Sequence, residues 1–200
     1  MPRTVGPVVQ PGSLSAGPQP ELTTAGGLLL RPWRPDDADD VAAVLTAFAD
    51  PEIQRWGVRH IVTAAQANAW LRGWTAAWIA ETDACWAVAG ADGVVGRVAL
   101  RRLDLAGGIA ELAYWVLPAA RRRGVASDAG AEASRWAVEE LGLHRLELCH
   151  SVHNPGSCAV ARRLGYALEG TQRDAMLHVD GWHDMHLHAL LRGRAVGGTN

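Results

Sequence analysis

The spacing of apolar and polar residues divides the chain into short strands and helices. A first strand is predicted at 28–33, followed by a helix with Asp36 as its N-cap that ends at Asp50-Pro51. Thr63 is expected to open a second helix, because Gln66 follows at the spacing of a capping box. Later strands are predicted at 85–89, 94–103, 109–117, 144–150, 166–177 and 182–191, and later helices at 124–141 and 155–164.

This order of elements, β-α-α-β-β-β-α-β-α-β-β, indicates the mixed α/β (α+β) class. It favours a sheet with helices on both faces over a helix bundle or a β-sandwich. The strand–helix–strand unit over 109–150 predicts a right-handed crossover, so its two strands are expected to be parallel.

The two ends of the chain differ from its middle. Residues 1–27 hold five of the ten prolines and few large apolar side chains. Such a segment predicts a disordered arm, or an arm that only drapes over the folded domain. The folded domain is expected over 28–192, with a flexible tail at 193–200.

Composition excludes several classes of protein. With 200 residues, of which 48% are hydrophobic, the chain can form one domain with a real core. It contains no apolar run of about 20 residues, so no membrane span is expected. A net charge of −2 gives no general attraction to nucleic acid or to anionic membranes. All 19 basic residues are arginine, which excludes mechanisms that need a lysine.

The three cysteines, Cys85, Cys149 and Cys158, are too few and too widely spaced for a disulfide scaffold or a CxxC metal site. They are expected to be reduced thiols of a cytoplasmic protein. Cys158 follows Ser157, which leaves open an acyl-cysteine route. That route would need a base paired to the thiol.

A group of histidines near the C-terminus has two interpretations. In a strand, His186 and His188 share one face, whereas His183 points to the other. Together with His178 they could form a metal cluster, but no nearby cysteine or carboxylate set other than Asp184 completes a tetrahedron. We therefore expect a solvated or substrate-facing hairpin and no metal. His153 is a separate candidate for a proton relay.

The segment Arg121-Arg122-Arg123-Gly124 lies between a predicted strand and a predicted helix. The first amides of a helix lack intrahelical partners, and a glycine lets a ligand approach the backbone. This arrangement is typical of a pyrophosphate site. A solvated arginine turn is the alternative, whereas three arginines are too few for a nucleic-acid interface.

Two motifs resemble the GNAT superfamily of acyl-CoA N-acyltransferases. Arg121-x-x-Gly124-x-Ala126 matches its coenzyme A motif, and Asn154-x-x-Ser157 through Leu164-Gly165-Tyr166 is similar to a second segment downstream. The strand Glu111-x-x-Tyr114-Trp115-Val116 is similar to the RimJ/RimL-like branch, which acetylates ribosomal-protein N-termini. The resemblance spans roughly 28–192. It implies a central, largely antiparallel sheet of six to seven strands that is splayed at its parallel pair.

The resemblance implies that acetyl-CoA is the co-substrate, although another acyl-CoA such as succinyl-CoA stays open. Backbone groups of Trp115 and Leu117 are expected to pair with the pantetheine arm, and loop amides to hold the pyrophosphate. An arginine at 97, 101 or 102 could take the extra carboxylate of a succinyl group. The expected cofactor-binding set is Trp115, Val116, Leu117, Arg121, Arg122, Arg123, Gly124, Val125, Ala126, Asn154 and Ser157.

The implied reaction is direct attack of an amine on the thioester in a ternary complex. Glu111 is the candidate base, with a solvated or arginine-paired carboxylate as the alternative. Ser157 is the candidate acid toward the thiolate, because Ala161 stands where many family members carry a tyrosine. For Ser157 the alternative is an ordinary first-turn serine, and for Asn154 it is a helix cap. The backbone amide of Trp115 or Val116 is the expected oxyanion donor.

The acceptor is expected to be a primary amine, either a protein N-terminus or a small molecule, near Trp56, Trp74, Glu111 and Trp182. The stripe of Trp70, Trp74 and Trp78 has a second interpretation, in which it packs a helix onto the sheet. A non-catalytic acyl-CoA-binding module is the alternative function. No metal, nucleic acid or membrane is expected, and the chain could be a monomer or a homodimer.

Overall fold

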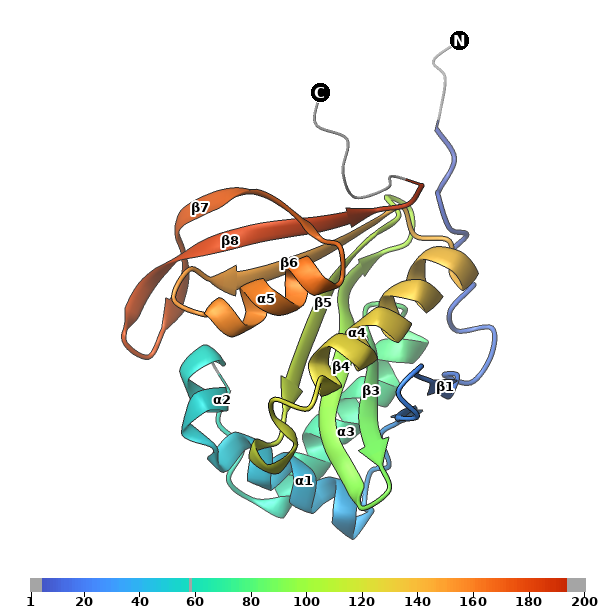
Figure 1. Ribbon diagram of the computed structural model, residues 1–200. Coiled ribbons are helices and arrows are strands. Elements are labelled where there is room, and N and C mark those ends of the chain that lie inside the picture. The colour runs from blue at the N-terminus through green and yellow to red at the C-terminus, as the bar shows by residue number, and fades with distance from the viewer. Residues whose placement is uncertain (1–4, 58, 194–200) are drawn as a thin grey trace.

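A computed structural model describes residues 5–57 and 59–193 of the chain and places them in a mixed α/β fold (Figure 1). The helices are α1 (Ala38–Ala49), α2 (Pro51–Trp56), α3 (Ala64–Ile79), α4 (Val125–Arg135) and α5 (Pro155–Arg163). The strands are β1 (Leu22–Thr23), β2 (Leu29–Pro32), β3 (Ala84–Gly90), β4 (Gly93–Asp104), β5 (Ile109–Val116), β6 (Arg145–Ser151), β7 (Ala167–His178) and β8 (Gly181–Leu191).

One eight-stranded sheet runs in the order β1-β2-β3-β4-β5-β6-β8-β7. The pair of β5 and β6 is parallel, as the crossover rule predicted, and the other neighbours in the sheet are antiparallel. The sheet has more strands than the six to seven expected, because the short β1 pairs with β2 at one edge.

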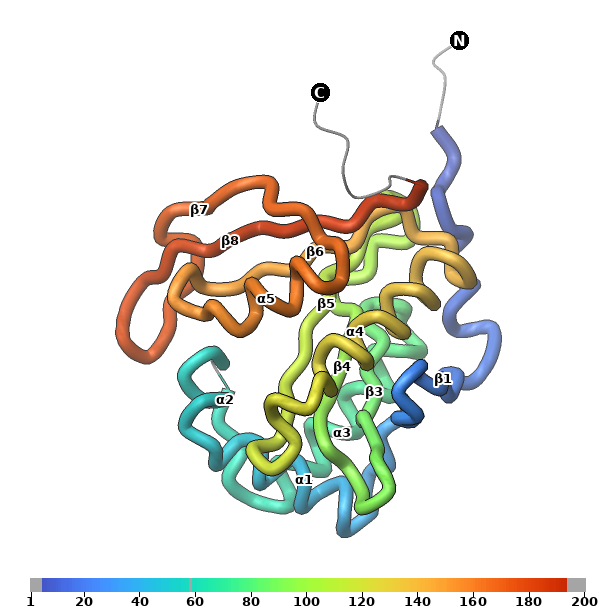
Figure 2. Tube along the Cα trace, in the orientation of Figure 1, coloured from blue at the N-terminus to red at the C-terminus, as the bar shows by residue number. Residues whose placement is uncertain are grey.

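The parallel pair separates after a short stretch. β5 and β6 are in register only at Ile109, Ala110 and Glu111, although β5 continues to Val116. Beyond Glu111, β6 stays paired with β8 as far as Ser151. The traces of β5 and β6 diverge from that point, which leaves α5, β6, β8 and β7 on one side of an opening (Figure 2). The splay is therefore located at the predicted strand pair.

The two faces of the sheet pack against different helices. Alternate side chains of β3 point to opposite faces and so belong to different cores. Trp86 and Val88 belong to the core that includes α4, whereas Cys85 and Ala87 belong to the core that includes α1 and part of α3. This confirms helices on both faces. Within the described ranges, no helix combines the length and apolar character needed to cross a bilayer.

The N-terminal segment is more ordered than predicted. Within the described part of residues 1–27, Leu14 and Leu22 are buried, and β1 is part of the sheet. The Glu81 carboxylate accepts hydrogen bonds from the amides of Gly12, Leu14 and Ser15. Composition failed here because a few apolar residues and one anchoring carboxylate hold a proline-rich segment against the domain. The predicted tail at 193–200 lies outside the described residues except for Gly193.

Local boundaries differ from the prediction at three places. Asp37, not Asp36, caps α1, because Asp36 takes φ 67° and its carboxylate pairs with Arg72. Pro51 begins α2, since the Asp50 side chain caps that helix. The helix expected over 124–141 ends at Arg135 and continues as a π-helical turn over Trp136–Glu140. Thr63 and Gln66 form the predicted capping box of α3.

We expect Glu81→Gln to release the N-terminal segment, because a neutral amide accepts weaker hydrogen bonds than a carboxylate. Limited proteolysis followed by mass spectrometry should show several-fold faster cleavage within residues 5–20. Asp92→Asn, at an exposed turn, is the matched control and should leave cleavage unchanged. Equal cleavage of the two variants would contradict the anchoring role of Glu81.

Candidate functional site

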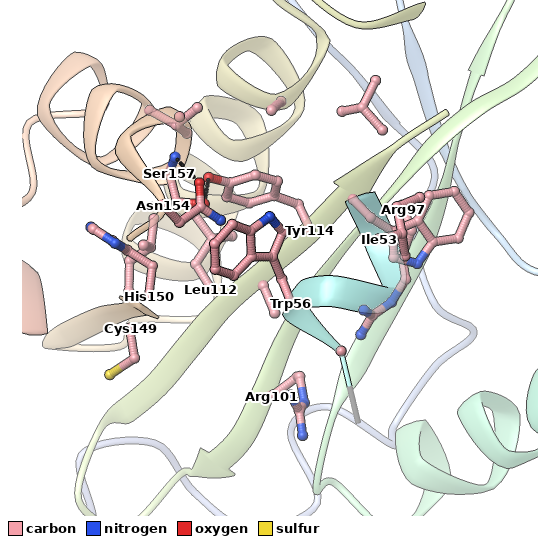
Figure 3. Close-up of a pocket in the computed structure, with 18 of the residues that line it drawn as sticks. Ile53, Trp56, Arg97, Arg101, Leu112, Tyr114, Cys149, His150, Asn154 and Ser157 are labelled. Atoms are coloured by element: carbon pink, nitrogen blue, oxygen red, sulfur yellow. Dashed lines mark hydrogen bonds between the residues drawn. The ribbon is translucent and has the colours of Figure 1, made fainter. Parts of the chain in front are cut away.

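A cleft of about 1160 Å³ occupies the opening between β5 and β6 (Figure 3). α2 and α3 contribute to its lining on one side, and α5 and the end of β6 contribute on the other. The first turn of α4 closes one end, through Val125, Ala126 and Ser127. The cleft exists because the two parallel strands stop pairing while both still belong to the sheet.

The edge of β5 that faces the cleft has no neighbouring strand beyond Glu111. The Leu117 amide donates to the Val95 carbonyl of β4 at 2.9 Å. Because alternate residues of a strand direct their backbone groups to opposite neighbours, Trp115 also faces β4, whereas Tyr114 and Val116 face the cleft. The expected pairing of Trp115 and Leu117 with the cofactor is therefore one residue out of register. Leu117 also lies outside the cleft lining.

The loop before α4 has the backbone shape of an anion cradle. Arg122 and Gly124 both adopt positive φ angles, 60° and 81°, and the Asp128 amide makes the first helical bond of α4, to the Gly124 carbonyl at 2.9 Å. By helix geometry the amides of Val125 to Ser127 are left without helical partners. The Gly124 N-cap supplies no side-chain bond to them.

The three arginines of this loop differ in their contacts and in whether they line the cleft. Arg121 forms an ion pair with Asp50 and donates from Nε to the Val116 carbonyl at 3.3 Å, so its guanidinium ties the loop to α2 and β5. Burial raises the pKa of Asp50, but the hydrogen bonds from Arg121 and the Ile53 amide, together with the charge of Arg121, outweigh burial and the net shift is downward. Arg122 lines the cleft, and Arg123 does not.

A hydroxyl pair lies across the cleft from this loop. The Tyr114 hydroxyl donates to Ser157 Oγ at 3.0 Å, and Asn154 caps α5 by accepting from the Ser157 amide at 3.0 Å (Figure 3). Burial raises the pKa of Tyr114 to about 12, although the bond to Ser157 opposes the shift. The phenol is therefore a neutral donor. The sequence prediction missed Tyr114, although its position on the quoted strand motif was the available signal.

Glu111 lines the cleft, with its carboxylate bound to the guanidinium of Arg102. The residue is buried, whereas the Arg102 side chain is largely exposed. The structure therefore contains the arginine-paired Glu111 carboxylate that the sequence analysis gave as an alternative. The pair holds the carboxylate at the wall of the cleft.

The end of the cleft between α2 and α3 is aromatic and cationic. Trp56, Trp70 and Trp74 line it, and the Arg97 guanidinium lies 4.7 Å from the centroid of Trp74. Arg101 also lines the cleft. Trp78 packs instead against Trp136, so the predicted indole stripe is divided between the cleft and the core.

Trp182 was expected at the acceptor end but lies outside the cleft lining, with 61% of its surface exposed. It stands just past the turn between β7 and β8, beyond the reach of the opening. His153, the relay candidate, is also outside the lining and packs against the His183 ring.

The hairpin histidines are buried, which corrects the expectation of a solvated hairpin, whereas His178 lines the cleft, as the substrate-facing alternative predicted. His178, His183 and His188 are at most 6% exposed. The reason is that other rings cover them: Trp56 of α2 packs against His178 and His183, and His150 of β6 stacks on His188. His183 bonds Ser151 Oγ at 2.8 Å, and its other ring nitrogen lies 2.9 Å from Asp180.

Comparison with known proteins agrees with this geometry. The model of the "Acetyltransferase (GNAT) domain" family matches residues 27–167. The "Putative ribosomal N-acetyltransferase YdaF" of Bacillus subtilis is 36% identical over 98 residues, which are 48% of this chain and 53% of that relative. The match therefore spans about half the length of YdaF.

Two solved structures share the fold. RimL, described as a ribosomal L7/L12 α-N-protein acetyltransferase in complex with coenzyme A, gives a TM-score of 0.78 at 17% identity over 86% of this chain and 98% of that one. Mycobacterium smegmatis RimJ, in complex with a coenzyme A disulfide, gives 0.75 at 23% identity over 86% of each chain. Because the family model covers most of the folded domain, the chain belongs to the GNAT acetyltransferase family.

We expect Gly124→Ala to lower the free energy of unfolding by about 1 kcal/mol, because an L-residue is strained at φ 81°. No atom lies within 4 Å of the added Cβ, so the cost comes from the backbone conformation and not from a clash. Gly170→Ala is the matched control, since Gly170 also has open space and its φ is not positive. Urea denaturation measures both, and an equal loss in the two variants would contradict the strain.

Proposed function

We propose that the protein is an acetyl-CoA-dependent N-acetyltransferase that acylates a primary amine by direct attack in a ternary complex. One continuous surface of the structure carries the proposal. The unpaired edge of β5 beyond Glu111 leads to the Gly124 cradle at the start of α4. An extended amide-bearing chain fits the strand edge, and a pyrophosphate fits the helix amides.

Backbone groups bind the cofactor more than charged side chains do. The pantetheine arm pairs with the cleft-facing backbone groups of Tyr114, and the amides from Arg122 to Ala126 hold the pyrophosphate. Arg121 keeps the cradle in position through Asp50. Asn154 sets the first turn of α5, which places Ser157 beside the arm.

The chemistry divides among three groups. The Glu111 carboxylate accepts the proton of the ammonium, directly or through water, and the free amine attacks the thioester carbonyl. The Val116 amide faces the cleft and stabilises the oxyanion. When the C–S bond breaks, Ser157 donates a proton to the thiolate, and the Tyr114 hydroxyl supports Ser157 by donating to Oγ.

The acceptor is a primary amine carried by a bulky group, of which a protein N-terminus is the leading candidate. The names of YdaF and RimL describe action on ribosomal proteins, and the aromatic wall of Trp56 and Trp74 suits a peptide. A different donor, succinyl-CoA, is the second candidate. Arg97 and Arg101 line the cleft and could bind its carboxylate.

Calorimetric titration with acetyl-CoA, succinyl-CoA and free CoA, compared side by side, tests the donor. We expect binding at one site per chain, with acetyl-CoA preferred. Amine acceptors, including N-terminal peptides of ribosomal proteins, are then screened with the donor that binds. If none of the three binds, the cofactor assignment and the function fail together.

Ser157→Ala is expected to lower kcat about 100-fold, the usual size of a general-acid contribution, with little change in acetyl-CoA affinity. Tyr114→Phe should give a smaller loss, because the phenol acts through Ser157. Steady-state kinetics with calorimetry on the same samples separates the two effects. Ser13→Ala is a serine control at an exposed position outside the cleft, and an equal loss there would contradict the role of Ser157.

Glu111→Gln separates the enzyme from a non-catalytic acyl-CoA-binding module. We expect turnover to fall at least about 100-fold while acetyl-CoA binding persists. Full turnover in this variant would remove Glu111 as the base. Wild-type protein that binds acetyl-CoA but acetylates none of the amines would favour the binding module.

The pH profile of kcat should show no loss of activity from Tyr114 below about pH 10, because burial raises the pKa of its phenol to about 12. A group that acts as a neutral donor works below its pKa and fails above it, so any loss from Tyr114 lies on the alkaline side. A falling limb between pH 8 and pH 10 that disappears in Tyr114→Phe would contradict this assignment.

A further inference from the structure

Four potential metal ligands come together where α5 packs on β6 and β8, at the wall of the cleft that His150 helps to line. One ligand atom from each of His150, Cys158, His186 and His188 lies within 4.8 Å of the other three. Within the described ranges, this is the one such group of at least three ligands. His150, His188 and Cys158 are buried, and His186 is partly buried.

Strand register explains how the group assembles. His150 of β6 lies directly opposite His186 of β8, so these two side chains share a face of the sheet. His188 is two residues further along β8 and returns to that face. α5 follows the loop after β6 and packs Cys158 against the same face. The sequence prediction considered the hairpin histidines alone and therefore lacked two of the four members.

The hydrogen bonds of His150 and His188 leave two lone pairs facing each other. His150 Nδ1 lies 2.8 Å from the Ser151 carbonyl, and His188 Nδ1 lies 3.3 Å from the Tyr166 carbonyl. A carbonyl oxygen only accepts, so both Nδ1 atoms carry the hydrogen. In neutral rings both Nε2 atoms are then bare, yet they lie 3.2 Å apart. A proton or a metal ion between the two nitrogens would relieve the repulsion of the facing lone pairs.

A shared proton would satisfy that contact, but it would leave two neighbours unexplained. The buried Nδ1 of His186 has no hydrogen-bond partner among the described residues. Cys158 Sγ belongs to the same group, and it accepts a hydrogen bond from the Arg162 guanidinium at 2.9 Å. A proton between His150 and His188 uses neither group, whereas a metal ion can bind both.

We propose that His150, Cys158, His186 and His188 form a tetrahedral site for a divalent transition-metal ion, with Zn²⁺ as the occupant. At Zn–N bonds of about 2.0–2.1 Å, two tetrahedral nitrogens are about 3.3 Å apart, close to the 3.2 Å seen here. Three imidazoles and one thiolate are borderline-soft ligands that suit zinc. The Nδ1–H bonds to carbonyls are the outer-sphere contacts that orient ligating histidines.

Four protein ligands leave no open position, so the ion has a structural role. Binding forms three Zn–N bonds and one Zn–S bond, displaces water from the ion and releases the thiol proton. The ion joins α5 to β6 and β8. Because Ser157 precedes Cys158, the ion also fixes the helical turn that carries the proposed acid. Support for the metal site does not rest on the proposed acetyl transfer.

The wild-type chain tests the site directly. Protein stripped with a chelator is titrated with Zn²⁺ in competition with a chromophoric indicator. We expect one ion per chain with a submicromolar dissociation constant, and a thermal midpoint that rises by several degrees on binding. Co²⁺ in place of zinc should give the visible bands of a tetrahedral ion and a thiolate charge-transfer band. Absence of stoichiometric binding by the wild type overturns the proposal.

Cys158→Ser and His186→Gln remove one ligand each and should weaken zinc affinity about 100-fold or more. Cys158→Ser should also abolish the charge-transfer band. Cys149→Ser and His144→Gln are matched controls, because Cys149 points to the other face of β6 and His144 is exposed. Ligand variants that bind zinc as tightly as these controls would overturn the site. The wild-type titration decides the question even if a ligand variant fails to fold.

Discussion

Hydrogen bonding between β5 and β6 stops at the Glu111–Glu147 pair, and the candidate site lies at and beyond that point. A parallel pair that continued would bury its backbone groups in the sheet and leave no opening. By ending, it exposes one edge of β5 and separates α5 from α4. The splay thus supplies both a strand edge for an extended ligand and space for two substrates.

Rigid ties surround this opening and hold its walls. Arg121 joins the loop before α4 to Asp50 between α1 and α2, and Arg102 fixes Glu111 at the wall. On the other side, Asn154 sets the first turn of α5. Each tie positions a group whose placement matters for chemistry, so the cleft is organised before any ligand enters.

Sequence patterns predicted the features that depend on local periodicity. The βαβ unit, the capping box at Thr63 and the glycine at the start of α4 are examples, because each is set by a few neighbouring residues. The sequence did not predict features that depend on contacts between distant segments of the chain. The Arg102 partner of Glu111, the Tyr114–Ser157 bond and the enclosure of His188 arise only when the sheet assembles. The one-residue error at Trp115 and Leu117 has the same origin, because the adjacent β4 decides which edge of β5 is free.

Tryptophan is distributed unevenly around this architecture. Trp56, Trp70, Trp74 and Trp115 border the cleft, whereas Trp78, Trp86 and Trp136 form a cluster in the other core. The indoles at the cleft are close enough to exchange excitation, and two of them flank the Arg97 guanidinium. The molecule therefore contains its own optical probe. A ligand in the opening is expected to change the emission of the indoles that border it, while the second cluster reports on the integrity of the core.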